Sequence, residues 1–252
     1  MTWSRAMTEK RVALVTGANK GLGFETSRQL AQLGIKVLMG ARDQTRGAAA
    51  VDRLRAAGLD VEFVQLDVTN AADISRVCAM VAKNFGRLDI LVNNAGIAHS
   101  GEQFFSNSTE TVSMQALRET FDVNFFGLVE LTKGLLPLIR KSPAGRIVNM
   151  SSMLGSLTLH SNPQTGLDQI KPLAYDASKA AVNQFTIHLA ALLKETPIKV
   201  NSAHPGWVRT DLGGEEAPMD TVEGAKTGVA LATLDNDGPT GGFFHLGQTM
   251  PW

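Results

Sequence analysis

The sequence predicts an α/β fold of three layers, in which helices cover both faces of a doubly wound, mostly parallel seven-stranded sheet. Short apolar runs alternate along the chain with longer segments of helical apolar spacing, the order expected of strand–helix–strand units. The chain has 252 residues, of which 44% are hydrophobic, and this suits one domain with a sizeable core. We therefore expect a flexible extension over residues 1–9 and a single domain over residues 10–252.

The expected elements follow from these apolar patterns. Strands are predicted over residues 12–15, 36–40, 61–66, 88–92, 145–150, 198–203 and 241–246. Helices are predicted over residues 22–33, 44–57, 113–135 and 221–234, with another that begins near Ala71 and another that carries Tyr175. Residues 159–173 are rich in Ser, Asn, Pro, Gln and Gly, so we expect a loop there.

Charge and composition limit the classes of partner. The chain has 24 Lys and Arg and 24 Asp and Glu, and its net charge of +0 gives no reason to expect nucleic acid. No run approaches the ~18 apolar residues of a membrane span, and the first ten residues lack the apolar core of a secretory signal. We therefore expect a cytoplasmic protein with neither a nucleic-acid nor a membrane partner.

Cysteine and histidine usage gives no sign of a metal or a disulfide. A single cysteine, Cys78, excludes an internal disulfide, and its helical apolar setting predicts a small buried side chain. The five histidines show no spacing typical of metal ligands, so we expect no catalytic metal. We interpret His204, which follows a predicted strand, as a packed or capping residue rather than a base.

A glycine-rich turn follows the first predicted strand, in the stretch RVALVTGANKGLG over residues 11–23. Backbone amides at the start of the next helix favour an anion, and residues without Cβ let a pyrophosphate lie against the backbone. The spacing of Gly17, Gly21 and Gly23 is not the G-x-G-x-x-G fingerprint. Taken alone, it fits either a dinucleotide site or a turn that serves only packing.

The residues after the second predicted strand should select the cofactor. An acid at this place accepts from the 2′-hydroxyl of NAD, whereas an arginine meets the 2′-phosphate of NADP. Asp43 suits NAD, but it also precedes a predicted helix, where aspartate is a common N-cap. Arg42, Arg46 and Lys20 are placed to converge on one phosphate, so we predict NADPH or NADP as the cofactor.

Tyr175 and Lys179 are separated by four residues in AYDASKAAV, a spacing that puts both side chains on one helix face. A phenol has a pKa near 10 and is a poor proton donor at neutral pH. An ammonium one turn away, or an oxidised nicotinamide, should lower that pKa. On its own this pair is more typical of an ordinary amphipathic helix.

The order of five motifs carries more information than any one of them. TGxxxGxG, NNAG, an asparagine in FDVNFFG, a Ser-Ser pair and YxxxK each follow a predicted strand or lie on a predicted helix. This order resembles the short-chain dehydrogenase/reductase family in its compact single-domain form. NKG, ARDxTRG, PGWVRTDLGG and PTGGFF particularly resemble carbonyl reductases of the family. The resemblance covers roughly residues 10–252 and implies a Rossmann-like fold.

Carried over position by position, the resemblance implies the catalytic set Asn124, Ser152, Tyr175 and Lys179. The catalytic hydroxyl falls on Ser152, with Ser151 as the alternative. Asn124 would anchor a water that leads to Lys179, although a helix-bending hydrogen bond or simple exposure would also explain an asparagine there.

The resemblance also implies how the cofactor is held. Asp67 would accept from the adenine amino group, although it serves equally well as a cap for the helix near Ala71. The NNAG asparagines mainly tie strands together, and the segment around Val208 and Thr210 would hold the nicotinamide carboxamide. The expected cofactor-binding residues are Gly17, Asn19, Lys20, Gly21, Leu22, Gly23, Arg42, Arg46, Asp67, Val68, Asn94, Ala95, Gly96, Tyr175, Lys179, Pro205, Gly206, Val208 and Thr210.

Together these parts predict the NADPH-dependent reduction of a ketone or aldehyde to an alcohol. Ser152 would polarise the carbonyl oxygen, and Tyr175 would donate the proton. Reduction of an imine or enone at the same site, or a non-catalytic NADP(H)-sensing role, remain as alternatives. A sugar-nucleotide epimerase fits less well, because the chain has no room for a separate substrate domain.

The substrate and the assembly are less defined by the sequence. Residues 159–173 should form part of a substrate lid or an insertion without function. Apolar residues near the expected cleft indicate a hydrophobic carbonyl compound. They are Met153, Leu154, Leu157, Leu159 and Trp207. A homo-oligomer, either dimer or tetramer, and a monomer both remain open.

Overall fold

The structure is a computed structural model that describes residues 10–102 and 104–252, so the extension predicted over residues 1–9 lies outside it. Its strands are β1 (Val12–Thr16), β2 (Lys36–Ala41), β3 (Val61–Gln65), β4 (Ile90–Asn93), β5 (Arg146–Met150), β6 (Lys199–Ala203), β7 (Phe243–His245) and β8 (Gln248–Thr249). Its α-helices are α1 (Gly21–Gln32), α2 (Gln44–Ala56), α3 (Ala71–Phe85), α4 (Met114–Phe121), α5 (Gly127–Ile139), α6 (Leu157–Ser161), α7 (Leu173–Leu192) and α8 (Thr221–Ala232).

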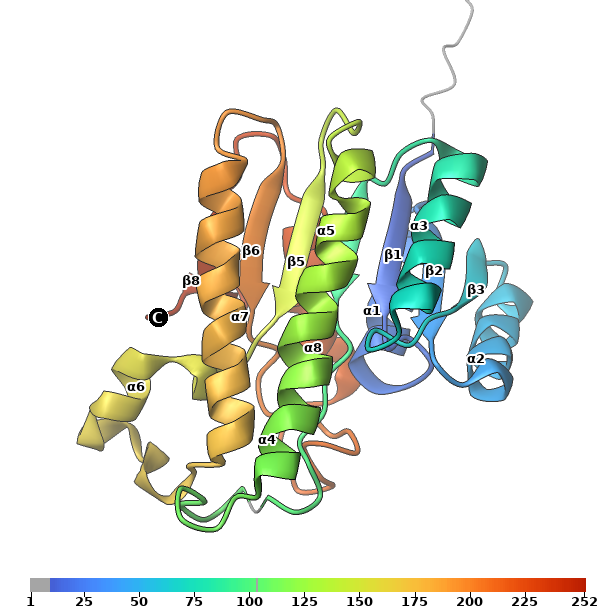
Figure 1. Ribbon diagram of the computed structural model, residues 1–252. Coiled ribbons are helices and arrows are strands. Elements are labelled where there is room, and N and C mark those ends of the chain that lie inside the picture. Colours follow the sequence, from blue (N-terminus) through green and yellow to red (C-terminus); the bar gives the residue numbers. More distant parts are fainter. Residues whose placement is uncertain (1–9, 103) are drawn as a thin grey trace, which may run out of the picture.

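The strands of the described chain form one sheet in the order β3-β2-β1-β4-β5-β6-β7-β8 (Figure 1). Neighbours from β3 to β7 run parallel, and β8 pairs antiparallel with β7. The order reverses between β1 and β4, so the predicted doubly wound α/β class is confirmed. The predicted number of seven strands is wrong by one, because β8 is two exposed residues without an apolar pattern.

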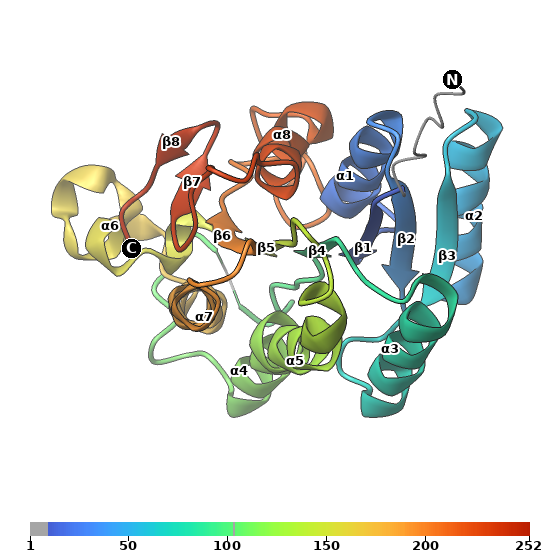
Figure 2. The same ribbon diagram turned by 90° about the horizontal axis from the view of Figure 1, so that it is seen from above.

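Helices cover both faces of the sheet (Figure 2). One apolar cluster joins the sheet to α1, α2 and α8, and a second joins it to α3, α5 and α7. Alternate residues of β1 serve the two clusters, with Ala13 and Val15 in the first and Leu14 in the second. Cys78 packs against the second cluster, but it is half-buried rather than buried as predicted. No helix within the described ranges is long and apolar enough to cross a membrane.

Side-chain caps explain where two helices begin. Asp43 accepts from the amide of Arg46 at 2.8 Å, which confirms its role as the N-cap of α2. The cap of α3 is Asn70, which accepts from two amides of the first turn. The alternative role of Asp67 as that cap is therefore wrong. Its carboxylate instead accepts from the amide and hydroxyl of Thr69.

The long helix predicted over residues 113–135 is interrupted. A π-helical turn, η1 (Asp122–Phe126), separates α4 from α5. Such a turn inserts one extra residue into the helix and is frequent at functional sites. Asn124 lies in this turn and is buried.

The loop predicted over residues 159–173 contains short helices. They are the end of α6, then η3 (Pro163–Thr165) and η4 (Leu167–Gln169). Ser156 caps α6 by accepting from the amide of Leu159, and Asn162 caps η3. The segment is therefore ordered by its own polar side chains rather than irregular.

The amino-terminal edge of the sheet is closed by a buried arginine. Arg146 at the start of β5 is 1% exposed and donates to the carbonyl oxygens of Gly145, Pro197 and Leu234 and to the side chain of Asn236. These hydrogen bonds connect the segments that precede β5, β6 and β7. The amino-terminal edge lies opposite the edge where the predicted site residues meet.

Candidate active site

The predicted site residues lie at the carboxyl edge of the sheet. The arrowheads of β1, β5 and β6 point to this edge, and α6 lies beyond it (Figure 1). The glycine-rich turn follows β1, the NNAG segment follows β4, and the serine pair follows β5. Parallel strands thus bring together segments that are far apart in the sequence, at the edge where such sheets bind ligands.

Tyr175 and Lys179 lie one turn apart on the same face of α7, as their spacing predicts. The two residues are 7% and 5% exposed. Lys179 Nζ lies 5.6 Å from the centroid of the Tyr175 ring and donates to the carbonyl oxygen of Met150 at 2.9 Å. The pair is therefore held against the end of β5.

Burial dominates the acid–base properties of this pair. It raises the pKa of Tyr175 to about 12, a rise that the hydrogen bond with Ser152 opposes and the charge of Asp176 increases. It also lowers the pKa of Lys179 to about 8. The expectation that Lys179 lowers the pKa of Tyr175 is wrong for this structure, because the loss of solvation outweighs any effect of the amine. The phenol accordingly keeps its proton at neutral pH.

The two serines after β5 face different partners. Ser152 is the one that forms a hydrogen bond with Tyr175, and its Oγ also accepts from the amide of Leu154 at 3.2 Å. Ser151 is turned towards α7, and its Oγ lies 3.5 Å from the carbonyl oxygen of Lys179. The geometry therefore favours Ser152 over Ser151 as the hydroxyl that would meet a substrate oxygen.

Asn124 joins the segment after β4 to α7. It is fully buried, so the alternative of simple exposure is wrong. Its Oδ1 accepts from the amide of Ile97, and its Nδ2 donates to the carbonyl oxygen of Ile97 and to the hydroxyl of Ser178. A Cβ added to Gly96 would lie 3.4 Å from both Asn124 Oδ1 and Lys179 Nζ, so these two polar groups border the same small space.

The glycine-rich turn has the geometry of a phosphate cradle. Gly17 and Gly21 have φ angles of +63° and +55°, which L side chains rarely adopt. A Cβ on Gly23 would come within 2.4 Å of the Gly17 carbonyl oxygen. Helix α1 begins after Lys20 without a side-chain cap. Uncapped amides at a helix start, reached over residues without side chains, suit an anionic phosphate.

The NNAG asparagines tie strands together, as expected. Asn93 donates to Asn149 at 2.8 Å and to the hydroxyl of Thr132 at 2.9 Å. Asn94 donates to the carbonyl oxygen of Thr16 at 2.7 Å, and so fixes the end of β4 beside the glycine-rich turn. These contacts confirm the structural part of the prediction.

The three predicted phosphate-binding cations have different surroundings. Lys20 pairs with Asp211, and Arg46 pairs with Asp43 at 3.0 Å. The hydrogen bond from Lys20 and the charge of Arg46 both hold the pKa of Asp211 below its usual range, so these two cations lie near one carboxylate. Arg42 is exposed. The structure therefore brings Lys20 and Arg46 together, and acids already pair with both.

The segment after β6 lies against the glycine-rich turn. A Cβ on Gly21 would be 3.4 Å from Thr210, whose hydroxyl donates to the carbonyl oxygen of Val208 at 3.3 Å. His204 is buried with its ring 4.8 Å from that of His245, and burial lowers its pKa to about 3, which confirms a packed residue. The other predicted cofactor residues also follow strand ends: Asn19 and Leu22 after β1, Val68 after β3, Ala95 after β4, and Pro205 and Gly206 after β6.

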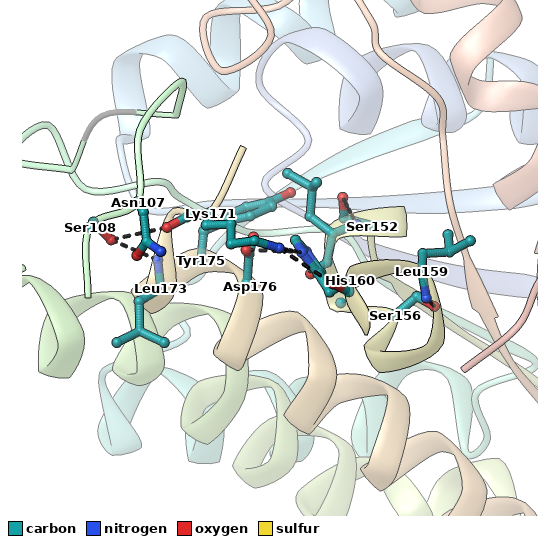
Figure 3. A network of polar contacts seen from close by, with 12 residues as sticks. Asn107, Ser108, Ser152, Ser156, Leu159, His160, Lys171, Leu173, Tyr175 and Asp176 are labelled. Carbon is teal, nitrogen blue, oxygen red and sulfur yellow. Dashed lines mark hydrogen bonds and ion pairs between the residues drawn. The ribbon is translucent and has the colours of Figure 1, made fainter. Parts of the chain in front are cut away.

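The sequence did not reveal a polar cluster beside Tyr175. His160 of α6 contacts both Lys171 and Asp176 (Figure 3), with Nδ1 3.2 Å from Lys171 Nζ and Nε2 3.2 Å from Asp176 Oδ2. The lysine donates to Nδ1, so the hydrogen of neutral His160 is on Nε2, which also lies 2.9 Å from the carbonyl oxygen of Leu154. The cluster therefore fastens α6 to the first turn of α7.

Aromatic side chains border the site. The Phe104 ring lies 5.4 Å from that of Tyr175, and Phe105 lies 6.4 Å from Trp207. Phe105 and Trp207 are 71% and 48% exposed, although both are large apolar residues. The prediction of apolar residues near the cleft included Trp207 but missed the two phenylalanines, because they lie in an irregular segment.

Comparison with known proteins gives one family throughout. Residues 11–221 match the family model described as short chain dehydrogenase. Carbonyl reductase (NADPH) 1 of Mus musculus is 38% identical over a gapped alignment of 283 positions that covers 97% of this chain and 99% of that protein. The (+)-neomenthol dehydrogenase of Capsicum annuum is 31% identical, with 94% and 96% covered. The crystal structure of NADPH-bound carbonyl reductase from chicken fatty liver superposes with a TM-score of 0.83 at 28% identity, covering 97% of this chain and 100% of that one.

Proposed function

This chain belongs to the short-chain dehydrogenase/reductase family, and from that membership we propose that it reduces a ketone or aldehyde to an alcohol with NADPH. One observation carries the proposal: a buried phenol, Tyr175, meets Ser152 and lies one helical turn from Lys179 at the ligand-binding edge of the sheet. The names of the carbonyl reductase relatives support both the carbonyl substrate and the choice of NADPH.

The residues that would hold NADPH follow from the cradle. The glycine-rich turn and the uncapped start of α1 would take the pyrophosphate. Lys20, Arg42 and Arg46 would take the 2′-phosphate, with Lys20 and Arg46 released from Asp211 and Asp43. Lys179 would donate to the nicotinamide ribose. When bound, the nicotinamide would supply the hydride.

The chain itself would supply the polarisation and the proton. Ser152 would donate a hydrogen bond to the substrate oxygen as negative charge develops there. Tyr175 keeps its proton at neutral pH and would transfer it to that oxygen. A bound oxidised nicotinamide and the Lys179 ammonium would offset the rise in pKa that burial causes. With a pKa of about 8, Lys179 exchanges protons readily near neutral pH, so it would return a proton to Tyr175. Asn124 would position the water that connects Lys179 to solvent.

The substrate is proposed to be hydrophobic. Phe104 contacts the Tyr175 ring, and its neighbour Phe105 packs against Trp207 with both side chains exposed. Leu157 at the start of α6 is also exposed. Exposed aromatic residues grouped at a polar reaction site are typical of a ligand-binding surface.

The experiment that tests this function is Tyr175→Phe. We expect turnover with NADPH and a hydrophobic ketone to fall by about 10² to 10⁴, because a positioned acid contributes that much. NADPH binding, measured by fluorescence titration, should stay close to that of the parent. Turnover that survives the substitution would refute the role of Tyr175.

The neighbouring serines provide a matched control. Ser152→Ala should also reduce turnover strongly, whereas Ser151→Ala should change it little, because Ser151 faces the backbone of α7. Kinetics with NADPH and NADH belong in the same experiment, since a preference for NADH would refute the cofactor assignment. A panel of ketones, aldehydes, imines and enones separates carbonyl reduction from its alternatives, and a sensor would bind NADPH without consuming it.

A further inference from the structure

Helix α7 carries Tyr175 in its first turn but has no cap of its own. The residue before the helix is Pro172, which makes no side-chain cap. The first amides of a helix lack intrahelical partners, and burying them without partners is costly. The position of Tyr175 therefore depends on what satisfies the amides of residues 173–175.

Two side chains from the segment between β4 and α4 satisfy all three amides. Glu102 accepts from the amide of Ala174 at 2.8 Å and from that of Tyr175 at 3.1 Å. Ser108 accepts from the amide of Leu173 at 2.8 Å and donates to Glu102 at 2.7 Å (Figure 3 shows Ser108 beside Leu173). Glu102 and Ser108 are 6% and 2% exposed.

The charge of Glu102 fits this place at the amino end of α7. A carboxylate is stabilised at the amino end of a helix, and a buried one needs such hydrogen bonds. The backbone strengthens the link, because the amide of Ser108 donates to the carbonyl oxygen of Lys171, and the amide of Lys171 donates to that of Ser106. The segment is thus attached to the start of α7 by both side chains and backbone.

We propose that Glu102 is a positioning residue for Tyr175, which it serves by fixing the first turn of α7 through the amides of Ala174 and Tyr175. The inference rests on the proposed function, in which Tyr175 donates the proton. Lys179 lies one turn further along and is held separately by Met150. Loss of Glu102 therefore displaces the proton donor while the lysine that would hold the cofactor stays in place.

The test compares Glu102→Ala, Glu102→Gln and Ser108→Ala with the parent. We expect kcat to fall about 10- to 100-fold in Glu102→Ala, because a small misplacement of a reacting group has an effect of that order. Glu102→Gln keeps an acceptor and should lose less, and Ser108→Ala should change kcat in the same direction. The KM for NADPH should stay within about twofold in all three, since Lys179 is not displaced.

Glu110→Gln is the matched control, because Glu110 is an exposed carboxylate of the same segment. It should leave kcat unchanged. Should Glu102→Ala fail to fold, the two milder variants decide the question. A kcat within twofold of the parent in folded variants, or a loss of NADPH affinity parallel to kcat, overturns the inference. Tyr175→Phe measured alongside separates the failures: if it loses turnover while the Glu102 variants do not, the positioning role alone is wrong.

Discussion

At the scale of single residues, Asp176 is a largely buried carboxyl near the site whose hydrogen bonds are incomplete. Its Oδ2 faces His160, while its Oδ1 has no hydrogen-bond partner among the described residues. Burial and the charge of Glu102 raise the pKa of Asp176 to about 8, although Lys171 acts in the opposite direction. The carboxyl is therefore more stable protonated in the folded protein than in the unfolded chain.

This pKa predicts how stability changes with pH. The folded protein binds the Asp176 proton more tightly, so the contribution is complete below about pH 4 and is lost as the pH rises towards 8. The free energy of unfolding should fall across this window by up to about 1.4 kcal/mol per pH unit. Asp176→Asn should remove that slope.

Denaturant melts of the parent and of Asp176→Asn between pH 6.5 and 8 check this prediction. Burial lowers the pKa of His160, so this residue destabilises the folded protein only below about pH 6.5, where the unfolded imidazole binds a proton. His160 therefore does not affect the comparison between pH 6.5 and 8. Equal slopes for the two proteins would contradict the raised pKa of Asp176.

At this scale, the sequence predicted those contacts that are made between residues close together in the chain. Four residues on a helix were enough to place Tyr175 beside Lys179. The sign of the pKa shift of Tyr175 was wrong, because spacing carries no information on burial. Glu102 went unnoticed, because it stands 73 residues before Tyr175 and no local pattern links the two.

At the scale of elements, the glycine-rich turn depends on the close approach of α1 to the end of β4. A Cβ on Gly23 would lie 2.4 Å from the Gly17 carbonyl oxygen and 2.5 Å from Asn94 Nδ2. Gly23→Ala should destabilise the protein by about 1–3 kcal/mol, because overpacking forces the backbone apart. It should also weaken NADPH binding, which thermal melts and titration would measure.

Gly228 of α8 offers a matched control. A Cβ there meets the Met150 sulfur at an ordinary distance of 3.4 Å, within a regular helix. Gly228→Ala should be neutral or stabilise by about 0.5–1 kcal/mol, since alanine favours helix. If both substitutions had the same effect, close packing at Gly23 would not be the cause.

The elements that the sequence predicted well are those with a strong apolar period. Strands β1 to β6 and helices α1, α2 and α8 lie within a few residues of their predicted bounds. The π-helical turn at Asp122–Phe126 was missed because residues 113–135 were interpreted as one continuous helical apolar pattern. The helices within residues 159–173 were missed because polar caps rather than apolar spacing define them.

At the scale of the whole molecule, the amino and carboxyl edges of the sheet have different roles. The carboxyl edge carries the candidate site, and the amino edge is closed by the hydrogen bonds of Arg146. Arg146→Leu should destabilise the fold by about 3 kcal/mol or more, because several buried acceptors lose a charged donor. The kcat of the folded protein should not change, since Ser152 lies beyond the other end of β5.

Thermal melts together with kinetics well below the melting temperature check this separation. Arg140→Leu is the control, because Arg140 is exposed at the end of α5. It should change stability by no more than about 0.5 kcal/mol. A lower kcat in folded Arg146→Leu would show that the two edges are coupled.

The contact between Glu102 and α7 also has a consequence for the order of synthesis. The acid leaves the ribosome 72 residues ahead of the Ala174 amide that it binds. At translation rates of about 5–20 residues per second, that delay is roughly 4 to 14 s. Throughout this interval Glu102 is hydrogen-bonded to water, because the amides of α7 have not yet been synthesised. The proton donor and its support can therefore form only late in translation, when the last third of the chain is being made.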